Sequence, residues 1–478
     1  MENTQDSALP ASLPAWCAEL QASLARMADT LRRELHPWQV SERVFCPEDF
    51  GSTPGEKATQ AIQRAIDQAS NGGGIVRLRH GDYVSGALVM RSRVCLEICA
   101  GARLLGSTNL ADYPEHHARR LTVQDTSMGM HQSLIFAEGC EDIALRGPGE
   151  INGRGTPDHF PGNETAQGTP GRPFVLRAID CRRITVQDLT LRDSPCWMQN
   201  YLNCEDLLIE RVTVRNHANY NNDGMDIDGC RRVLIRNCDV RSGDDALCFK
   251  GAGQRELSDV LVENCSFLSA CNAVKVGTDT QGDFRRVWVR SCRIGGLLED
   301  PSGLKHPWCD SAVSLEMVDG GCLENILLTD LTIERAWSPF FMRLEDRGRV
   351  KPGDPKPAAG TLRNAAILRV TGTDCGPRGS YFVGIPEKAI ESICLHDIHI
   401  RQKASSRPAL REQDIGELRG VYPDAHMIDA LGDAPAYALW ARHVHGLTLD
   451  AYEVTPEGDE ARPALVAESD VQDLHINM

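Results

Sequence analysis

A spaced pattern of apolar residues recurs along this chain and constrains its fold more than any other feature. A large apolar residue or a cysteine is followed by apolar residues three and five positions later, as in Cys204, Leu207 and Ile209. Four successive instances, starting at Cys204, are offset by 26, 27 and 27 residues. Alternating apolar residues indicate strands, and a fixed period of this length indicates a solenoid. The instances begin at Cys140, Cys181, Cys204, Cys230, Leu257, Phe284, Leu323, Leu362, Ile390, Val444 and Val471.

The simplest solenoid of this kind is an all-β, parallel β-helix, in which each turn stacks about 4.8 Å above the last. The longer gaps, of 39 to 54 residues, predict turns that carry insertions or turns whose pattern is hidden. Cysteines at the leading position predict core columns filled by a small apolar side chain. One such column is Cys140, Cys181, Cys204 and Cys230, and a second, at another phase, is Cys238, Cys265 and Cys292.

A second strand aligns in each turn, and its outward positions carry the chemistry. The aligned pieces are 223–228, 245–250, 272–277 and 311–316, with the third and fifth positions apolar and therefore facing inward. Positions one, four and six then face outward in three columns. The columns are Asp223, Asp245, Asn272 and Ser311; Asp226, Cys248, Lys275, Ser314 and, if the next turn is 341–344, Arg343; and Asp228, Lys250, Gly277 and Glu316.

This alignment predicts a groove with acids at its centre and cations to one side. Asp223 would stack beside Asp245, with Asp244 next to it. Hydrolysis of a glycosidic bond uses such a group, because one carboxylic acid protonates the leaving oxygen and another carboxylate activates water. The alternative for a single Asp-Gly or Asp-Asp pair is a solvated turn. For Lys250, which stacks near Asp228, a structural ion pair competes with a contact to ligand.

The chain resembles glycoside hydrolase family 28, the polygalacturonases and their relatives. The resemblance rests on the spacing of Asn222–Gly224 to Asp244–Asp245 and extends from about Asp49 to the C-terminus. It also includes 72–74, 81–83 and 194–197, although glycine motifs of this kind occur in other β-helix families. The resemblance implies a right-handed β-helix that hydrolyses pectin with inversion. It also implies that Asp244 is the general acid and that Asp223 and Asp245 hold the attacking water.

The chain departs from the family pattern at two positions that usually hold the uronate carboxylate. The family has a His where this chain has Asn272, and an Arg-Ile-Lys where it has 314–316. These losses put the substrate in doubt more than the reaction. Lys275 and Arg343 flank the vacated position in the column alignment and could replace the missing cations. The predicted substrate-binding residues are Asn222, Lys250, Asn272, Lys275 and Arg343.

Composition and the first residues predict the compartment and exclude some partners. The 18 cysteines without a Cys-x-x-Cys pair predict free thiols, a reducing compartment and no zinc site. The histidines show no metal-like spacing, so neither metal nor cofactor is expected. Residues 1–14 lack a basic and an apolar region, and no run approaches a membrane span, so we expect a cytoplasmic protein. The net charge of −16 argues against nucleic acid and favours a short oligosaccharide over a long polyanion.

The first 45 residues are expected to form a helical extension that precedes a β-helix domain over 46–478. Apolar residues at helical spacing between Pro14 and Pro37 predict one helix, and Ala58–Ala69 is a second. The first helix could cap the open end of the coil or pack against a second subunit to form a homo-oligomer. The loops 347–360 and 402–436 are long enough to wall off the groove.

The sequence as a whole favours an inverting glycosidase that acts on short, galacturonate-containing oligosaccharides. An exo mode suits a cytoplasmic enzyme, because polymers cannot enter the cell. Three alternatives remain open at this stage. They are a hydrolase of another linkage, such as one in rhamnogalacturonan or a neutral sugar; a pectate-lyase-like enzyme that needs Ca²⁺; and a carbohydrate-binding β-helix without activity.

Overall fold

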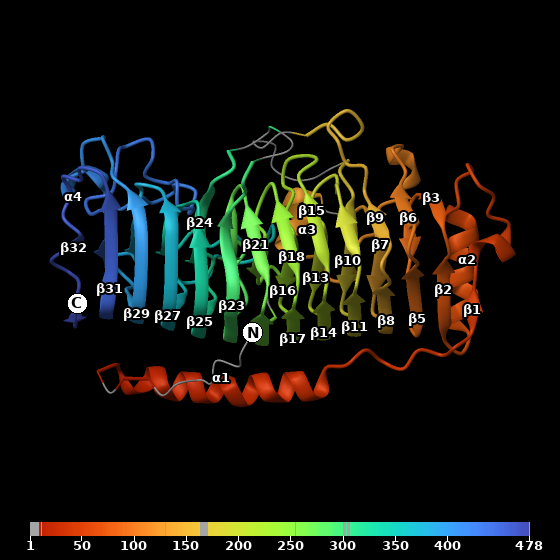
Figure 1. Ribbon diagram of the computed structural model, residues 1–478, viewed down its shortest axis with the longest axis horizontal. Coiled ribbons are helices and arrows are strands. Elements are labelled where there is room, and N and C mark those ends of the chain that lie inside the picture. The colour runs from red at the N-terminus through yellow and green to blue at the C-terminus, as the bar shows by residue number, and fades with distance from the viewer. Residues whose placement is uncertain are drawn as a thin grey trace.

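The computed structural model describes residues 9–10, 12–129, 131–162, 171–253, 255–299, 303 and 306–477. It is a right-handed parallel β-helix whose turns stack along one axis (Figure 1). Each turn contributes up to three strands, which we call first-row, second-row and third-row strands in chain order. The first two rows form one sheet of 21 strands, and the third row forms a sheet of 12 strands.

The strand bounds follow the rows. The first row begins with β1 (Val44–Phe45) and contains β2 (Gly74–Leu78), β5 (Val94–Ile98), β8 (Glu141–Arg146), β11 (Arg182–Gln187), β14 (Glu205–Glu210), β17 (Arg231–Arg236) and β20 (Leu257–Glu263). The second row contains β3 (Gly81–Ser85), β6 (Ala102–Gly106), β9 (Glu150–Asn152), β12 (Thr190–Arg192), β15 (Thr213–Asn216), β18 (Asp239–Ser242) and β21 (Ser266–Ser269).

Toward the C-terminus the first two rows merge into long strands. These are β23 (Phe284–Gly296), β25 (Cys322–Glu334), β27 (Thr361–Cys375), β29 (Ile390–Lys403) and β31 (Val444–Glu457), followed by β33 (His475–Asn477). The third row contains β4 (Leu88–Val89), β7 (Ser133–Glu138), β10 (Phe174–Ile179), β13 (Gln199–Leu202), β16 (Met225–Asp228), β19 (Leu247–Lys250), β22 (Asn272–Val276), β24 (Cys309–Met317), β26 (Ala336–Leu344), β28 (Ser380–Val383), β30 (Leu439–Arg442) and β32 (Leu465–Ala467).

The strand register confirms the predicted repeat. Leu257 pairs with Phe284, Phe284 with Leu323, and Ile390 with Val444, all in parallel. The longer gaps in the pattern are insertions between strands, such as the segment from the end of β29 to the start of β30. The stacked side chains fill one continuous core inside the coil.

The predicted cysteine columns are confirmed by their contacts. The Cys140 N–H lies 3.4 Å from the Cys181 sulfur, and the Cys204 N–H lies 3.4 Å from the Cys230 sulfur. These thiols are buried, and all 18 cysteines, each of which lies in the described part of the chain, are free thiols in the structure. Burial and neighbouring thiols raise the pKa of Cys204 well above its usual range. Such thiols act as packing groups rather than as reactive ones.

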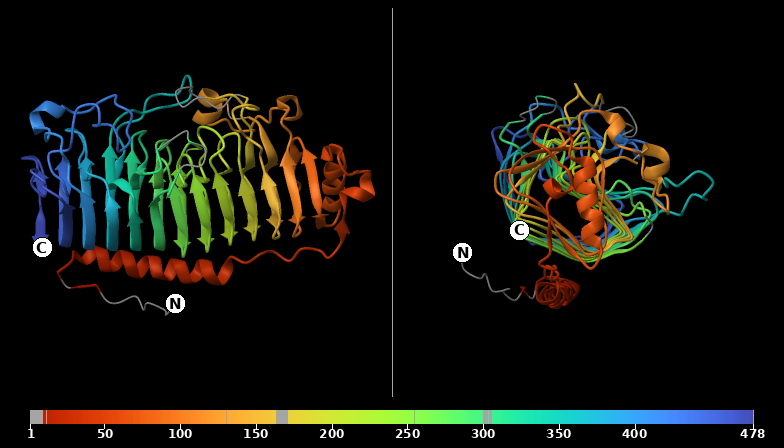
Figure 2. Two further views of the ribbon diagram at one scale, coloured as in Figure 1. Left: turned by 45° about the horizontal axis from the view of Figure 1, so that its top comes forward. Right: turned by 90° about the vertical axis from the view of Figure 1, so that its right-hand side faces the viewer.

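Of the two N-terminal helices, the second caps an end of the coil and the first takes a place that the sequence did not suggest. Helix α2 (Thr59–Ser70) covers the N-terminal end of the coil, where it packs on β2 and on the short helix η1 (Pro47–Phe50). Helix α1 (Ala15–Glu34) does not cap an end; it lies along the outside of the first-row strands, as both views in Figure 2 show. Helix α1 therefore packs on the protein's own sheet and not on an open end of the coil, whereas a contact with a second subunit stays a prediction.

The reason is an apolar stripe on the outer face of the first-row strands. One outward residue of each successive strand is apolar and buried under α1. Leu20, Leu24 and Leu31 of α1 complete this second core, with exposed fractions of 6%, 0% and 1%. The apolar face of the helix is therefore covered by the chain itself. The stripe consists of Leu208, Leu234, Leu261, Trp288, Leu327, Ala366 and Cys394.

The remaining helices are short and lie in the loops of the other side. They are η2 (Leu110–Asp112), α3 (Val123–Met128) and α4 (Glu412–Ile415). Helix α3 begins with a capping box between Thr122 and Asp125. No helix in the described part of the chain is long and apolar enough to cross a membrane.

Candidate active site

The three predicted catalytic acids lie in short loops that lead from a second-row strand into a third-row strand. Asp223 lies between β15 and β16, and Asp244 and Asp245 lie between β18 and β19. The two loops stack because the Gly224 N–H donates to the Asp245 carbonyl oxygen at 2.8 Å. Asp223 and Asp245 are buried, whereas Asp244 is half-buried. The structure thus brings the three carboxylates together on adjacent turns.

The backbone of Asp244 is fixed by the ends of two second-row strands. Its carbonyl oxygen accepts hydrogen bonds from Ser242 Oγ at 2.5 Å and from Ser269 Oγ at 2.6 Å. Its carboxylate oxygen Oδ1 accepts the Asp245 N–H at 3.0 Å. Because Asp244 is the most exposed of the three acids, it is the one that a molecule arriving from solvent meets first.

Asn272 orients Asp245 and has its own amide occupied. Its Nδ2 donates to Asp245 Oδ1 at 2.8 Å and to Asp424 Oδ2 at 3.2 Å, and its Oδ1 accepts from Ser311 Oγ at 2.6 Å. The side chain is fully buried. The predicted contact of Asn272 with substrate is therefore not what the structure shows; the residue positions a catalytic candidate instead.

Lys275 sits at the centre of a buried cluster of acids. Its Nζ lies 3.0 Å from Asp424 Oδ2, 3.4 Å from Asp245 Oδ2 and 3.8 Å from Glu316 Oε1. Burial opposes the charge, but the surrounding carboxylates outweigh it and raise the pKa of the Lys275 ammonium. The cation lies among these carboxylates and is itself enclosed, with 3% of the residue exposed.

Lys250 forms a second charged cluster, one turn earlier. Its Nζ lies 3.4 Å from Asp226 Oδ1 and 4.0 Å from Asp223 Oδ2 and stands 4.5 Å above the Trp197 ring. The ion pair that competed with a ligand contact is present, although the partner is Asp226 rather than the stacked Asp228. Lys250 is 5% exposed, so this cation is also enclosed.

Burial raises the pKa of several carboxyl groups on this face. The pKa of Asp223 lies well above its usual range, first because of burial and then because Asp226 and Asp244 repel its charge. Burial likewise raises the pKa of Asp226 to about 8, that of Asp228 to about 7 and that of Glu316 to about 8. Asp223 and Asp226 repel each other and titrate together, so this face of the coil carries protons near neutral pH.

The prediction for Arg343 is wrong because its strand is displaced by two residues. In β26, Phe341 lies opposite Ser314, and Arg343 lies opposite Glu316. Arg343 is fully buried, with its NH2 nitrogen 3.4 Å from Glu345 Oε2. Its guanidinium also donates to backbone carbonyl oxygens of the 404–438 segment. Arg343 therefore anchors a loop and does not replace the family's missing cation.

Asn222 is also structural. Its Nδ2 donates to the carbonyl oxygens of Ser194 and Cys196 at 2.8 and 2.9 Å, and its Oδ1 accepts the Asn219 N–H at 2.5 Å. The side chain is fully buried. The predicted substrate contact of Asn222 is corrected accordingly: the residue holds the loop that presents Asp223.

The two long loops pack against the third-row face, as the sequence suggested. The 404–438 segment, predicted from the sequence as 402–436, contributes Asp424 to the cluster around Lys275. In the 347–360 segment, Arg347 donates to Asp319 Oδ1 at 2.9 Å. Asp424 was not predicted, because nothing in its surroundings shares the phase of the repeat.

Among the described residues, two groups of side chains at or next to the site have the composition of a metal-ligand set: one contains Asp244, and the other consists of Asp310, Asp424 and His426. The ligand atoms of Asp244, Asp245 and Cys271 lie within 4.8 Å of one another. A thiol beside two carboxylates is neither the all-oxygen set that Ca²⁺ prefers nor a four-ligand zinc site. The ammonium of Lys275 already supplies a positive charge beside Asp245 at 3.4 Å. The donor set therefore matches an ion-paired acid cluster better than a metal site.

Comparisons with known proteins agree with the fold and point to one family. The model of the Glycosyl hydrolases family 28 matches residues 94–294. Exopolygalacturonase X-1 of Emericella nidulans is 24% identical over 343 residues, covering 68% of this chain and 75% of that protein. The crystal structure of an exopolygalacturonase from Thermotoga maritima superimposes with a TM-score of 0.66 at 18% identity, covering 80% of this chain and 92% of that one. The family 28 exopolygalacturonase of Yersinia enterocolitica gives 0.64 at 16% identity, covering 91% and 78%.

Proposed function

Because the chain belongs to glycosyl hydrolases family 28, we propose that it hydrolyses galacturonate-containing oligosaccharides from a chain end, with inversion. The observation that carries the proposal is the meeting of Asp223, Asp244 and Asp245 on adjacent turns, with Asp244 the most exposed. A glycosidase with an inverting mechanism needs one protonated and one ionised carboxyl group on opposite sides of the scissile bond.

The surroundings of each acid support separate roles. Asp245 accepts a hydrogen bond from Asn272 and lies beside the Lys275 ammonium, so its carboxylate is held in a fixed orientation and suits the general base. Asp244 is fixed through its backbone and reaches solvent, so it suits proton donation to the leaving oxygen. Asp223 has a raised pKa and lies beside both, so it suits a proton-sharing partner that helps to hold the water.

Closure of the groove beyond the acids supports the exo mode. The Asp424 carboxylate accepts a hydrogen bond from Asn272 and pairs with Lys275, and both of these residues belong to the turn after Asp245. A chain bound at the acids therefore meets the 404–438 segment within about one rung of the coil. A groove obstructed on one side suits a chain end better than the middle of a polymer.

The place of action and the oligomeric state are part of the same proposal. Buried free thiols suit a reducing compartment, and short oligosaccharides are substrates that can reach the cytoplasm. We further propose that the enzyme works without a subunit contact through α1, since its apolar face is packed against its own strands.

Incubation of the purified protein with galacturonate oligomers of increasing length tests the proposal. We expect release of one saturated monosaccharide at a time, seen by chromatography and mass. An unsaturated, ultraviolet-absorbing product that a chelator suppresses would indicate a lyase. Binding of the oligomers without any product would indicate a carbohydrate-binding protein and would contradict the proposed hydrolysis.

A further inference from the structure

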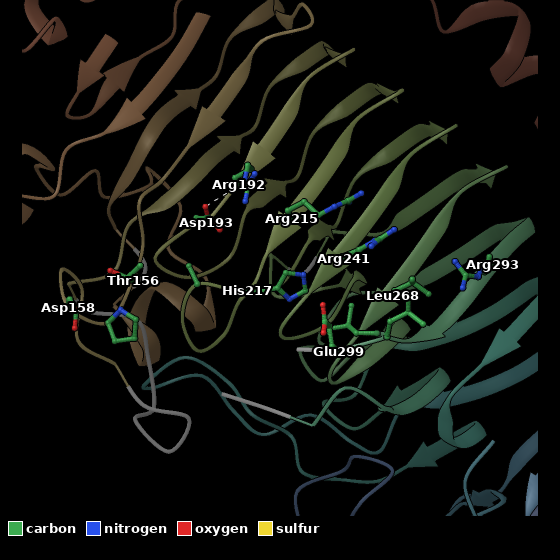
Figure 3. A pocket seen from close by; sticks show the side chains of 14 residues that line it. Thr156, Asp158, Arg192, Asp193, Arg215, His217, Arg241, Leu268, Arg293 and Glu299 are labelled. Atoms are coloured by element: carbon green, nitrogen blue, oxygen red, sulfur yellow. Dashed lines mark ion pairs between the residues drawn. The ribbon is translucent and has the colours of Figure 1, made fainter. Parts of the chain in front are cut away.

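A groove of about 830 Å³ lies on the second-row side of the loops that carry the acids. Arginines of β12, β15, β18 and β23 lie on its floor, with Leu268 of β21 between the last two, and Figure 3 shows Arg192, Arg215, Arg241 and Arg293 in a line across the strands. The turns at 156–158 and 297–299 line the groove beside this floor. The acids of the active site do not line it.

Three of these arginines form a ladder in strict register. Arg192 of β12 pairs with Arg215 of β15, which pairs with Arg241 of β18. Successive rungs of a parallel sheet are about 4.8 Å apart, so like charges stand side by side. Cross-strand neighbours of like charge are destabilising, so the ladder costs stability unless anions lie against it.

Asp193 and Asp239 pair with the ladder, and Asp158 and Glu299 line the groove at its turns. Asp193 lies 3.6 Å from Arg192, while Arg215 and Arg241 share the single carboxylate of Asp239, which stands 3.8 Å from Arg241 Nε. That Nε is buried and has no hydrogen-bond partner among the described residues. The side chains of Arg192 and Arg241 are 46% and 42% exposed, so both guanidinium groups are accessible from the groove.

We propose that this groove binds a run of uronate carboxylates, as a second site for acidic oligosaccharides beside the catalytic acids. This inference rests on the proposed function. A guanidinium recognises a carboxylate through two parallel hydrogen bonds, and a ladder of them matches a chain that carries one carboxylate on each sugar.

The ladder lies close enough to the active site for one oligosaccharide to contact both. Arg241 lies three residues before Asp244 on the same strand and loop. The cations beside the acids, Lys250 and Lys275, are enclosed and paired, whereas the ladder is accessible. A local row of positive charge also lets a chain of net charge −16 attract a polyanion.

The test uses a variant that cannot consume its ligand. In an Asp244→Asn background, we measure binding of a galacturonate hexamer by calorimetry before and after adding Arg215→Gln together with Arg241→Gln. We expect binding to weaken by roughly tenfold and to become less sensitive to salt, as for two partly exposed ion pairs. Arg182→Gln, which removes an arginine of similar exposure on a first-row strand, is the matched control and leaves binding unchanged.

A variant that is expected to tighten binding distinguishes loss of the site from misfolding, because misfolding can only weaken binding. Asp239→Asn frees Arg215 and Arg241 and should tighten binding by about threefold. An unchanged dissociation constant in the double variant, or equal binding of a carboxyl-reduced hexamer, would overturn the inference. Hydrolysis is measured separately on the protein with Asp244 intact. Arginine-dependent binding without hydrolysis would remove the proposed function and leave this groove as a binding site.

Discussion

Two outer faces of the same coil are covered in opposite ways. On the first row, the outward residues are apolar, and α1 buries them. On the third row, several outward residues near the catalytic acids are charged, and they are buried as ion-paired clusters. Apolar burial stabilises by about 25 cal/mol per Å², whereas burial of charges costs several kcal/mol per ion before pairing repays it. The first cover is thus explained by stability, and the second requires another reason, which we take to be catalysis.

The largest effect that separates the two faces is expected at Asp244. Asp244→Asn keeps the shape of the side chain but cannot donate a proton, so kcat should fall by about 10²–10⁴. The melting temperature should stay unchanged, because the backbone contacts of the residue to Ser242 and Ser269 remain. Initial rates and thermal unfolding measure both quantities. A variant that keeps more than about a tenth of the wild-type kcat would show that Asp244 is not the acid.

Lys275→Met should impair both activity and stability. It leaves Asp245, Asp424 and Glu316 as uncompensated buried acids, which is expected to cost about 3–5 kcal/mol of unfolding free energy. Loss of the ammonium that lies beside the Asp245 carboxylate should lower kcat/KM by about ten- to a hundredfold. Denaturant unfolding and kinetics at one pH provide the two numbers. A fall in stability alone would assign Lys275 to the fold and not to the reaction.

The apolar face should show stability effects without kinetic ones. Leu24→Ala in α1 removes a fully buried side chain from the second core and should cost about 2–4 kcal/mol. The kcat/KM of the folded enzyme should not change. Arg26→Ala, at an exposed position of the same helix, is the control and should have little effect. A kinetic defect in Leu24→Ala would mean that the two faces are coupled.

The smallest effect is expected in the pH dependence of stability. Because burial raises the pKa of Asp226 and Glu316 to about 8, their protons are held more tightly in the folded state. The free energy of unfolding should therefore fall from about pH 5 to about pH 8. Carboxyls of lowered pKa, such as Glu460 at about 2, contribute stability that is complete above about pH 5.

Glu316→Gln tests this assignment directly. Removing one titrating group should make the decline of the melting temperature shallower by roughly 2–5 °C. Thermal scans of both proteins across this pH range make the comparison. Equal slopes would show that Glu316 is already ionised in the folded protein.

The repeat made much of the fold and the acid cluster predictable. In each turn, core residues three and five positions after the leading residue fix which residues of successive turns lie side by side. The alignment therefore predicts the pairing of Cys248 with Lys275, which the structure shows. The same pattern failed at Arg343, because side chains alternate with a period of two. A slip of two residues keeps the inside and outside of a strand unchanged, and only a slip of one reverses them.

Two other features lay outside what the repeat could specify. Asp424 comes from an insertion far along the chain, where no periodicity fixes its position. The position of α1 was ambiguous because an apolar face on a helix shows that the face is buried but does not show which surface buries it. A usable sign existed in the apolar residue at +4 of each turn, such as Leu234, Leu261 and Trp288, which faces outward and needs a cover.

The configuration of the first product tests the central claim most directly. Proton NMR during hydrolysis of a galacturonate oligomer reads the anomer released before mutarotation. Since an inverting reaction displaces the leaving group by water in one step, the account predicts the anomer opposite to that of the substrate linkage. Release of the same anomer would indicate a covalent intermediate and contradict the assignment of Asp223, Asp244 and Asp245.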